Sequence, residues 1–189
     1  LCVAIEELAR VDSSVAITLE AAVSLGAMPI LRFGTEEQKR EWLPRLAAGE
    51  LIGGFGLTEP GGGSDAGATR TTAVLDGDEW VINGTKIFTS GADKADYIWL
   101  ACRTAPDAPK HKGISMIIVD MKTPGISVDP LSLLSSHDIN ATFFDDVRVD
   151  DVLNGVIAGI FAAAGQTCVA GSRLLVHRSV ADELVEKVS

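Results

Sequence analysis

The first 50 residues carry apolar positions at a helical spacing and predict three helices, over residues 1–9, 14–27 and 35–47. The second of these is apolar almost all round, so we expect it to be buried between neighbouring elements. The second and third helices start at capping residues, which are Asp12 or Ser13 for the second and Thr35, with Gln38 three residues later, for the third. Gly49 is predicted to end the third helix.

From residue 51 to 149 the pattern changes to short β-branched and aromatic runs separated by turn residues. Asp76-Gly77 and Asn83-Gly84 are typical hairpin turns. The residues between the runs at 104–112 include two prolines and alternating charges, which predicts an exposed, mobile loop. We therefore expect a small antiparallel barrel or sandwich with strands at 51–57, 71–75, 79–83, 85–89, 97–103, 113–120, 126–130 and 141–149.

The last 40 residues return to a helical pattern at 151–164, followed by a strand-like run at 173–177 and a helix from Ser179 to Val188. The predicted fold class is thus α+β, in three parts: a partial helical domain at 1–50, a β-domain at 51–149, and a helix-strand-helix segment at 150–189.

Composition and charge exclude several classes of function. The chain has 189 residues, 47% of them apolar, and a formal net charge of −10, which disfavours nucleic acid or an anionic membrane surface as partner. Its three cysteines and three histidines show no disulfide or metal-binding spacing. No signal peptide and no apolar run near 18 residues is evident, so we expect a cytoplasmic protein. The first residue is Leu1 and the pattern starts mid-helix, which suggests a fragment of a longer chain.

The most distinctive stretch is Phe55–Asp65, where an apolar run ends in three glycines and two small polar residues. Consecutive glycines that stay ordered are expected to have positive φ or a close backbone approach to something bulky, here a ligand. Pro60 stiffens the start of the loop, while Thr58 and Ser64 place hydroxyls at its two ends. A plain surface turn is the alternative interpretation.

This stretch resembles the flavin- and substrate-binding loop of the acyl-CoA dehydrogenase family, at Gly56, Leu57, Thr58, Glu59, Gly62, Gly63, Ser64, Asp65 and Ala68. A second landmark of that family lies at Val81–Gly91. The resemblance implies FAD as cofactor, an acyl-CoA substrate, an electron-transferring flavoprotein as partner, and a homo-oligomer. It places cofactor-binding residues at Phe55, Gly56, Leu57, Thr58, Gly63, Ser64, Phe88, Thr89 and Ser90, with Ser64 also touching the acyl-CoA.

Two of these residues have plain structural alternatives. The resemblance implies that Phe88 packs against one flavin face, although Phe88 could instead belong to the barrel core. Ser64 could merely cap the glycine turn. A β-domain that has lost its cofactor and serves as a binding or assembly module is the rival interpretation of the whole stretch.

Dehydrogenation of an acyl thioester needs a base for the α-hydrogen and an acceptor for the β-hydride. In the family the base is a glutamate of a C-terminal helical domain, which this sequence does not contain. We expect Glu59 to be structural, and Glu183 and Glu186 to lie on the solvent face of the last helix. The chain alone is therefore predicted not to oxidise acyl-CoA.

A different resemblance begins near residue 150. Phe161–Ser172 is similar to the nucleophile motif of aldehyde dehydrogenases, which implies Cys168 as nucleophile and an alternative NAD(P)-dependent aldehyde oxidation. That mechanism also needs a dinucleotide-binding domain and an upstream glutamate, and no glutamate lies between Glu79 and Glu183. A buried, inert thiol is the alternative for Cys168. The two resemblances meet near Val149 without a linker, which favours a recombinant or mis-assembled reading frame over a bifunctional enzyme.

Overall fold

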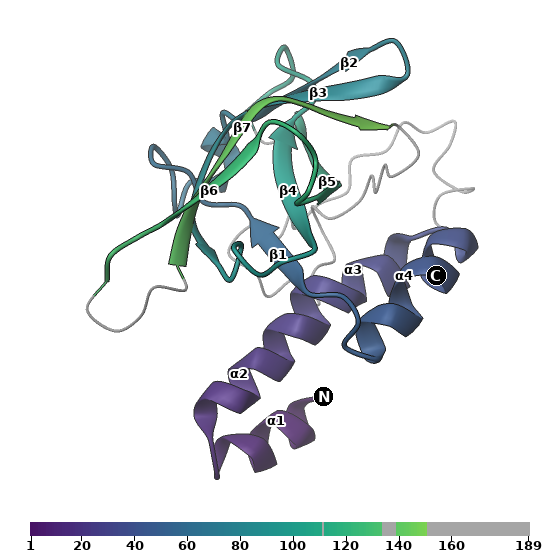
Figure 1. Ribbon diagram of the computed structural model, residues 1–189, viewed down its shortest axis with the longest axis vertical. Coiled ribbons are helices and arrows are strands. Elements are labelled where there is room, and N and C mark those ends of the chain that lie inside the picture. Colours follow the sequence, from purple (N-terminus) through teal and green to yellow (C-terminus); the bar gives the residue numbers. More distant parts are fainter. Residues whose placement is uncertain (111, 134–138, 151–189) are drawn as a thin grey trace.

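The computed structural model describes residues 1–110, 112–133 and 139–150. The predicted helix-strand-helix segment, including Cys168, lies outside these residues. Figure 1 shows the helices gathered on one side of a curled sheet. The helical elements are α1 (Cys2–Ala9), α2 (Ser13–Ala21), the π-helical turn η1 (Ala22–Ala27), α3 (Met28–Phe33) and α4 (Glu36–Ala47).

The predicted helix ends are partly confirmed. The Asp12 carboxylate accepts hydrogen bonds from the amides of Ser14 and Val15, so Asp12 is the N-cap of α2. The capping box at α4 is present, with the Gln38 amide 3.2 Å from the Thr35 hydroxyl oxygen. The predicted end near residue 27 is wrong, because α2, η1 and α3 form one run from Ser13 to Phe33. Proline is tolerated in the first turn of a helix, and the Pro in α3 lies there.

The expected burial of this long helical run is also wrong for the described residues. Val15 and Ile17 are 49% and 66% exposed, while the buried positions of the run include Ala16, Ser24 and Ile30. The run is long and apolar enough, by length and composition alone, to cross a membrane, so the expectation that no apolar stretch reaches that length is wrong. Soluble core helices meet the same criterion, and Ile30 packs against the sheet residues Tyr97 and Trp99.

Within the described residues the sheet has seven strands, and its main path runs β1-β4-β2-β3-β7-β6, with β5 paired to β4. Most pairings are antiparallel, whereas β1 and β2 pair with β4 in parallel. This curled sheet next to helices confirms the α+β fold class. The strands are β1 (Gly53–Gly56), β2 (Thr72–Asp76), β3 (Glu79–Ser90), β4 (Tyr97–Arg103), β5 (Ile114–Asp120), β6 (Ile126–Pro130) and β7 (Ile139–Asp150), and a 3₁₀ turn, η2 (Ala66–Ala68), follows the glycine-rich stretch.

The predicted hairpin at Asn83-Gly84 does not exist. Residues 79–90 form one strand that pairs with β7 along its length, and the register shifts between Ile82 and Gly84. At that shift the Asn83 side chain donates to the Asp146 carboxylate and accepts from the Asp146 amide, both at 2.9 Å. Asp146 has a φ of 49°, so the irregular backbone belongs to β7 and β3 continues through the dipeptide. The other predicted hairpin, at Gly77, joins β2 to β3.

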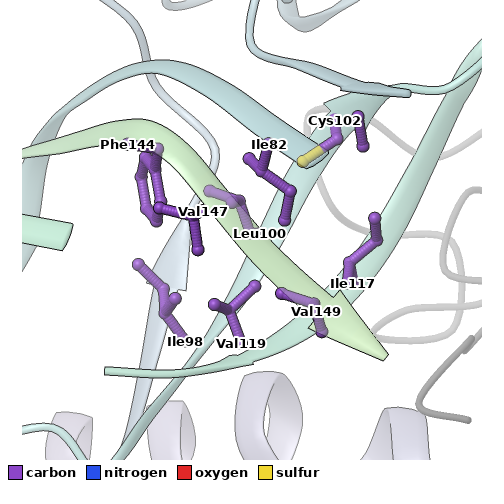
Figure 2. Packing of buried hydrophobic residues seen from close by; sticks show 10 residues of the cluster. Ile82, Ile98, Leu100, Cys102, Ile117, Val119, Phe144, Val147 and Val149 are labelled. Carbon is purple, nitrogen blue, oxygen red and sulfur yellow. The ribbon is translucent and has the colours of Figure 1, made fainter. Parts of the chain in front are cut away.

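Strand β4 separates two apolar clusters because its side chains alternate between the two faces of the sheet. Ile98, Leu100 and Cys102 point into the cluster inside the curled sheet, where Ile82, Ile117, Val119, Phe144 and Val147 meet them (Figure 2). Tyr97, Trp99 and Ala101 point to the helices and pack with Ile30 and Trp42. Burial on both faces explains why β4 is an unbroken apolar run, and it anchors β1 beside the helices.

Candidate functional site

The glycine-rich stretch forms a tight turn between β1 and η2. The amide of Glu59 donates to the carbonyl of Gly62, and the amide of Gly62 donates back to the carbonyl of Glu59, both at 3.1 Å. None of Gly61, Gly62 and Gly63 has a positive φ, which corrects one of the two expectations for them. A Cβ added at Gly61 or Gly63 would meet nothing within 4 Å. The glycines therefore present bare backbone on an open surface, which is the arrangement that a bulky ligand would require.

Beneath this turn lies a buried ion pair. Lys86 of β3 is fully buried, Glu59 is 8% exposed, and their Nζ and Oε1 atoms are 2.8 Å apart. The Glu59 carboxylate also accepts from the amides of Arg70 and Thr71 and from the Thr71 hydroxyl, at 2.7–2.9 Å. This confirms that Glu59 is structural, since both of its oxygens are already engaged.

The charges of this pair are set by opposing effects. Burial alone would raise the pKa of Glu59, but the hydrogen bonds from Lys86 and Thr71 outweigh it and hold that pKa below its ordinary value. Burial lowers the pKa of Lys86, and the Glu59 carboxylate opposes this change. The pair is thus an ammonium and a carboxylate that depend on each other in a dry interior.

The two sequence landmarks meet at this ion pair. Lys86 Nζ donates to the carbonyl oxygen of Leu57 at 3.1 Å, and the amide of Ile87 donates to the carbonyl of Thr58 at 2.9 Å. Among the described residues, the amide and hydroxyl of Thr58 have no hydrogen-bond partner. Two polar groups of the half-buried Thr58 therefore remain available to a ligand.

Phe88 lies immediately beyond this contact and is exposed, not in the barrel core. Residues 87 and 89 pair with the consecutive residues Ala141 and Asn140 of β7, so Phe88 is an extra residue in β3. This bulge reverses the inward-outward alternation that places Ile82 and Lys86 inside, and Phe88 is 58% exposed with a φ of 60°. Positive φ is unfavourable for an aromatic residue and indicates a constrained position.

Thr89, the residue after Phe88, is held by hydrogen bonds to β7. The Thr89 hydroxyl is 2.7 Å from the Thr142 hydroxyl and donates to the Asn140 carbonyl at 3.0 Å, and Thr89 is only 2% exposed. The Asn140 side chain in turn donates to the Thr89 carbonyl at 3.2 Å. The Thr89 side chain is therefore occupied inside the sheet, whereas Ser90 is exposed.

At the other end of the glycine turn, Ser64 is exposed and makes no hydrogen bond among the described residues, so it does not cap the turn. Its neighbour Asp65 pairs with Lys110. Arg103 donates to the carbonyls of Gly67, Thr69 and Lys110, at 2.8, 3.0 and 3.2 Å. These contacts tie Lys110, in the loop predicted at 104–112, and Arg103, just before it, to the residues that follow Ser64.

Phe55 and Gly56 have packing roles in β1. The Phe55 side chain packs against the helix-side cluster. A Cβ on Gly56 would come within 2.9 Å of side-chain atoms of both Ile98 and Leu100, so close packing against β4 explains this glycine. Leu57 also packs against the helix-side cluster. The site thus rests directly on the core of the protein.

Sequence reasoning missed four residues that organise the site: Lys86, Arg103, Asn140 and Thr142. Lys86 lies within the second landmark, and its even-numbered spacing from Ile82 indicated an inward side chain. The other three gave no signal, because their partners are distant in sequence.

The remaining candidates for chemistry do not gather at this site. Burial raises the pKa of the Cys102 thiol to about 12, so Cys102 is not a reactive nucleophile, and Cys2 is exposed in spite of its apolar neighbours. No group of metal-binding side chains occurs in the part of the chain that the structure describes. Cys168 and the three histidines lie outside that part.

A helical layer, a curled sheet, a turn of bare glycines and an exposed aromatic bulge on β3 together define an α+β protein with a candidate ligand-binding surface. Family models agree with this class: "Acyl-CoA dehydrogenase, N-terminal domain" matches residues 1–50, and "Acyl-CoA dehydrogenase, middle domain" matches residues 54–152. The chain belongs to the acyl-CoA dehydrogenase family.

Individual relatives support the same assignment. The acyl-CoA dehydrogenase FadE29 of Mycobacterium tuberculosis is 55% identical over 124 residues, which cover 65% of this chain and 32% of that protein. An acyl-CoA dehydrogenase from Geobacillus kaustophilus superposes with a TM-score of 0.74 at 39% identity, covering 81% of this chain and 41% of that one. The structure of a "Tcur3481-Tcur3483 steroid ACAD" gives a TM-score of 0.72 at 46% identity, covering 78% and 38%. The chain spans about a third of the length of the first curated relatives.

A third family model, for the aldehyde dehydrogenase family, matches residues 128–189. Its first part overlaps the middle-domain match, and β7 and the last three residues of β6 lie in that overlap. Because β7 pairs with β3, and β6 pairs with β7, in the sheet that carries both sequence landmarks, the described part of the overlap is structurally part of the acyl-CoA dehydrogenase sheet.

Proposed function

We propose that this chain supplies the flavin- and acyl-CoA-binding surface of an FAD-dependent acyl-CoA dehydrogenase. The observation that carries the proposal is the exposed bulge at Phe88, which lies one residue from the contact between Ile87 and Thr58. A strained, solvent-exposed aromatic next to unpartnered polar groups is costly without a ligand and useful with one. A glutaryl-CoA dehydrogenase from Mycobacterium smegmatis, 38% identical to this chain, is described in complex with FADH2.

The residues present fit such a group. Thr58 would donate its amide and hydroxyl to the polar edge of the isoalloxazine ring, and Phe88 would cover one ring face, with Ser90 beside it. When bound, FAD supplies the acceptor for the hydride that leaves the β-carbon of the substrate. Gly63 and Ser64, on the open side of the turn, would contact the cofactor, and Ser64 would also contact the acyl-CoA. Phe55, Gly56 and Thr89 would support these contacts from within the sheet.

The described residues do not offer a base for the α-proton within this surface. Glu59 already accepts four hydrogen bonds, and Asp65 is paired with Lys110. We therefore propose that the 189-residue chain binds FAD but does not dehydrogenate acyl-CoA by itself, and that turnover requires the further helical domain of its relatives. We also propose that the chain divides at residues 50 and 149, as the sequence pattern predicts.

The descriptions of the relatives support proposals for the substrate and the partners. Two matching structures carry the description "steroid ACAD", so a steroid-derived acyl-CoA is a candidate substrate together with ordinary fatty acyl-CoAs. Another matching structure is described as an electron transferring flavoprotein and a further one as a ChsE4-ChsE5 complex. We propose an electron-transferring flavoprotein as acceptor, an oligomeric assembly, and a cytoplasmic location.

The test is a titration of the purified chain with FAD, followed by flavin fluorescence and by thermal unfolding. Saturable binding that raises the melting temperature is expected, and no binding would refute the proposed site. Anaerobic mixing of the loaded chain with saturated and steroid-derived acyl-CoAs should leave the flavin oxidised. Bleaching of the flavin would show that the chain contains a base and would refute the second part of the proposal.

The aldehyde dehydrogenase match supports a second candidate, oxidation of an aldehyde by NAD(P) through Cys168. We propose instead that residues 150–189 are joined near Val149 by a recombinant or mis-assembled reading frame and that this activity is absent. Amplification of source DNA across the codons for Val149 to Asp151 tests the join, since a continuous frame there would contradict it.

A further inference from the structure

Lys86 makes two contacts that bracket the residue expected to meet the flavin. Its Nζ lies 3.1 Å from the carbonyl oxygen of Leu57 and 2.8 Å from Oε1 of Glu59. Thr58 lies between these two positions of the chain. A single fully buried ammonium group therefore fixes the backbone immediately before Thr58 and the side chain immediately after it.

The direction of the Thr58 amide follows from the planarity of the peptide bond. In a trans peptide the carbonyl oxygen of residue 57 and the amide hydrogen of residue 58 point in opposite directions. Because Lys86 holds the Leu57 oxygen toward the interior, the Thr58 hydrogen points outward. The next peptide is held in the same way, since the Ile87 amide donates to the Thr58 carbonyl at 2.9 Å.

The buried charge of Lys86 indicates a role other than stabilising the fold. A buried ion pair contributes little net stability compared with apolar side chains of similar volume, because both charges lose their hydration. An apolar residue at position 86 would fill the same space in the sheet without fixing the Leu57 carbonyl. The arrangement around Glu59 is also over-determined, with Arg70 and Thr71 as additional donors. These contacts specify geometry more than they add stability.

We propose that Lys86 is a positioning residue that aims the amide hydrogen of Thr58 at the flavin, with Glu59 holding the lysine in place. This inference rests on the proposed function, because the flavin is the group that would accept the hydrogen bond. Lys86 itself does not touch the cofactor. Its role is to keep one donor pre-oriented, which lowers the ordering cost of binding.

The experiment compares three variants with the wild-type chain: Lys86→Met, the double variant Lys86→Met/Glu59→Gln, and Val119→Ala. Lys86→Met removes the donor and leaves a buried carboxylate unpaired, so both the melting temperature and FAD affinity should fall. The double variant removes the unpaired charge and should recover the melting temperature. Its FAD dissociation constant should remain about tenfold above that of the wild type, since the Leu57 carbonyl still lacks its donor.

Val119→Ala is the matched control for general destabilisation. Val119 is fully buried in the cluster inside the sheet, and among the described residues it makes no hydrogen bond to the glycine turn. This variant should lower the melting temperature and leave the FAD dissociation constant and the absorption spectrum of the bound flavin unchanged. Equal losses of affinity in Val119→Ala and Lys86→Met would overturn the proposal.

A readout without FAD examines the positioning directly. The Thr58 amide, observed by ¹⁵N relaxation in the free protein, should be rigid in the wild type and in Val119→Ala, and mobile in both variants that lack Lys86. Unchanged order of this amide, or full recovery of FAD affinity in the double variant, would overturn the proposal while leaving the proposed function intact. A wild-type chain that binds no FAD would instead refute the proposed function, and the flavin part of this inference would fall with it.

Discussion

Replacement of Phe88 by asparagine should change stability and flavin affinity in opposite directions. Phe88 has a φ of 60°, a conformation that costs a non-glycine residue roughly 1–2 kcal/mol but that asparagine tolerates better than most residues. The side chain is 58% exposed, so its loss removes little packing in the free protein. We expect Phe88→Asn to raise the free energy of unfolding by about 0.5–1 kcal/mol.

Flavin affinity should fall, by an amount that the exposed area bounds. A phenylalanine side chain presents roughly 200 Å², of which 58% is exposed here, leaving about 115 Å² available. If a flavin ring covered half of this area, at about 25 cal/mol per Å², the contact would contribute about 1.4 kcal/mol, or roughly tenfold in the dissociation constant.

Urea unfolding monitored by circular dichroism gives the stability, and flavin fluorescence titration gives the affinity. Leu75→Asn is the matched control, because Leu75 is 52% exposed on β2 and belongs to neither landmark; it should not weaken FAD binding. A Phe88→Asn protein that is less stable than the wild type would show that the ring packs on the protein itself. Unchanged FAD affinity would contradict the assignment of Phe88 to the flavin.

Three further outcomes are expected. Gly84→Ala should destabilise the fold by about 3 kcal/mol in urea unfolding. A Cβ at residue 84, whose φ is 153°, would lie 2.5 Å from the Thr71 hydroxyl oxygen and 2.7 Å from the Thr71 Cα. A loss below about 1 kcal/mol would mean that Thr71 can move away. The pKa of Glu59 is held below its ordinary value of 4.5, so the ionised carboxylate stabilises the fold above that pH and loses this effect as the pH falls through its lower folded-state pKa. Between neutral pH and the acid range, the wild type should therefore lose more unfolding free energy than Glu59→Gln. Parallel curves of unfolding free energy against pH would exclude a contribution from this carboxylate. The chain should show no NAD-dependent aldehyde oxidation, and activity that disappears in Cys168→Ala would restore the alternative function.

Much of the fold could be predicted because its signals are local. The capping box at Thr35 depends on residues three apart, and the strand at 97–103 is an apolar run that matches β4 residue for residue. The Asn83-Gly84 prediction failed for a non-local reason. That dipeptide favours a hairpin turn in isolation, but Asn83 pairs with Asp146, 63 residues away, and the sheet keeps the chain extended.

The exposure of the helical run from Ser13 to Phe33 was mispredicted for a related reason. Apolar residues on every side indicate that a helix will be buried, yet they do not indicate which element will cover each side. In the described residues the sheet covers one side, through Ile30, and Val15 and Ile17 remain exposed on another. The sequence pattern indicated that the helix is hydrophobic, but it did not indicate which element packs against it.

The orientation of Phe88 shows why the flavin site needed a structure as well as a motif. The inward position of Lys86 would carry Phe88 into the core by simple alternation, and one extra residue in β3 reverses this. That residue is not marked by a glycine or an asparagine, the usual signs of an irregular strand. The fully buried Lys86, the positive φ at Phe88 and the close approach of Gly84 to Thr71 each break a local rule of stable folding, and all three lie between residues 84 and 88 of β3. Residues that each lower the stability of the fold and that lie beside one loop are difficult to explain by stability. They indicate that the sequence is selected for the geometry of that loop.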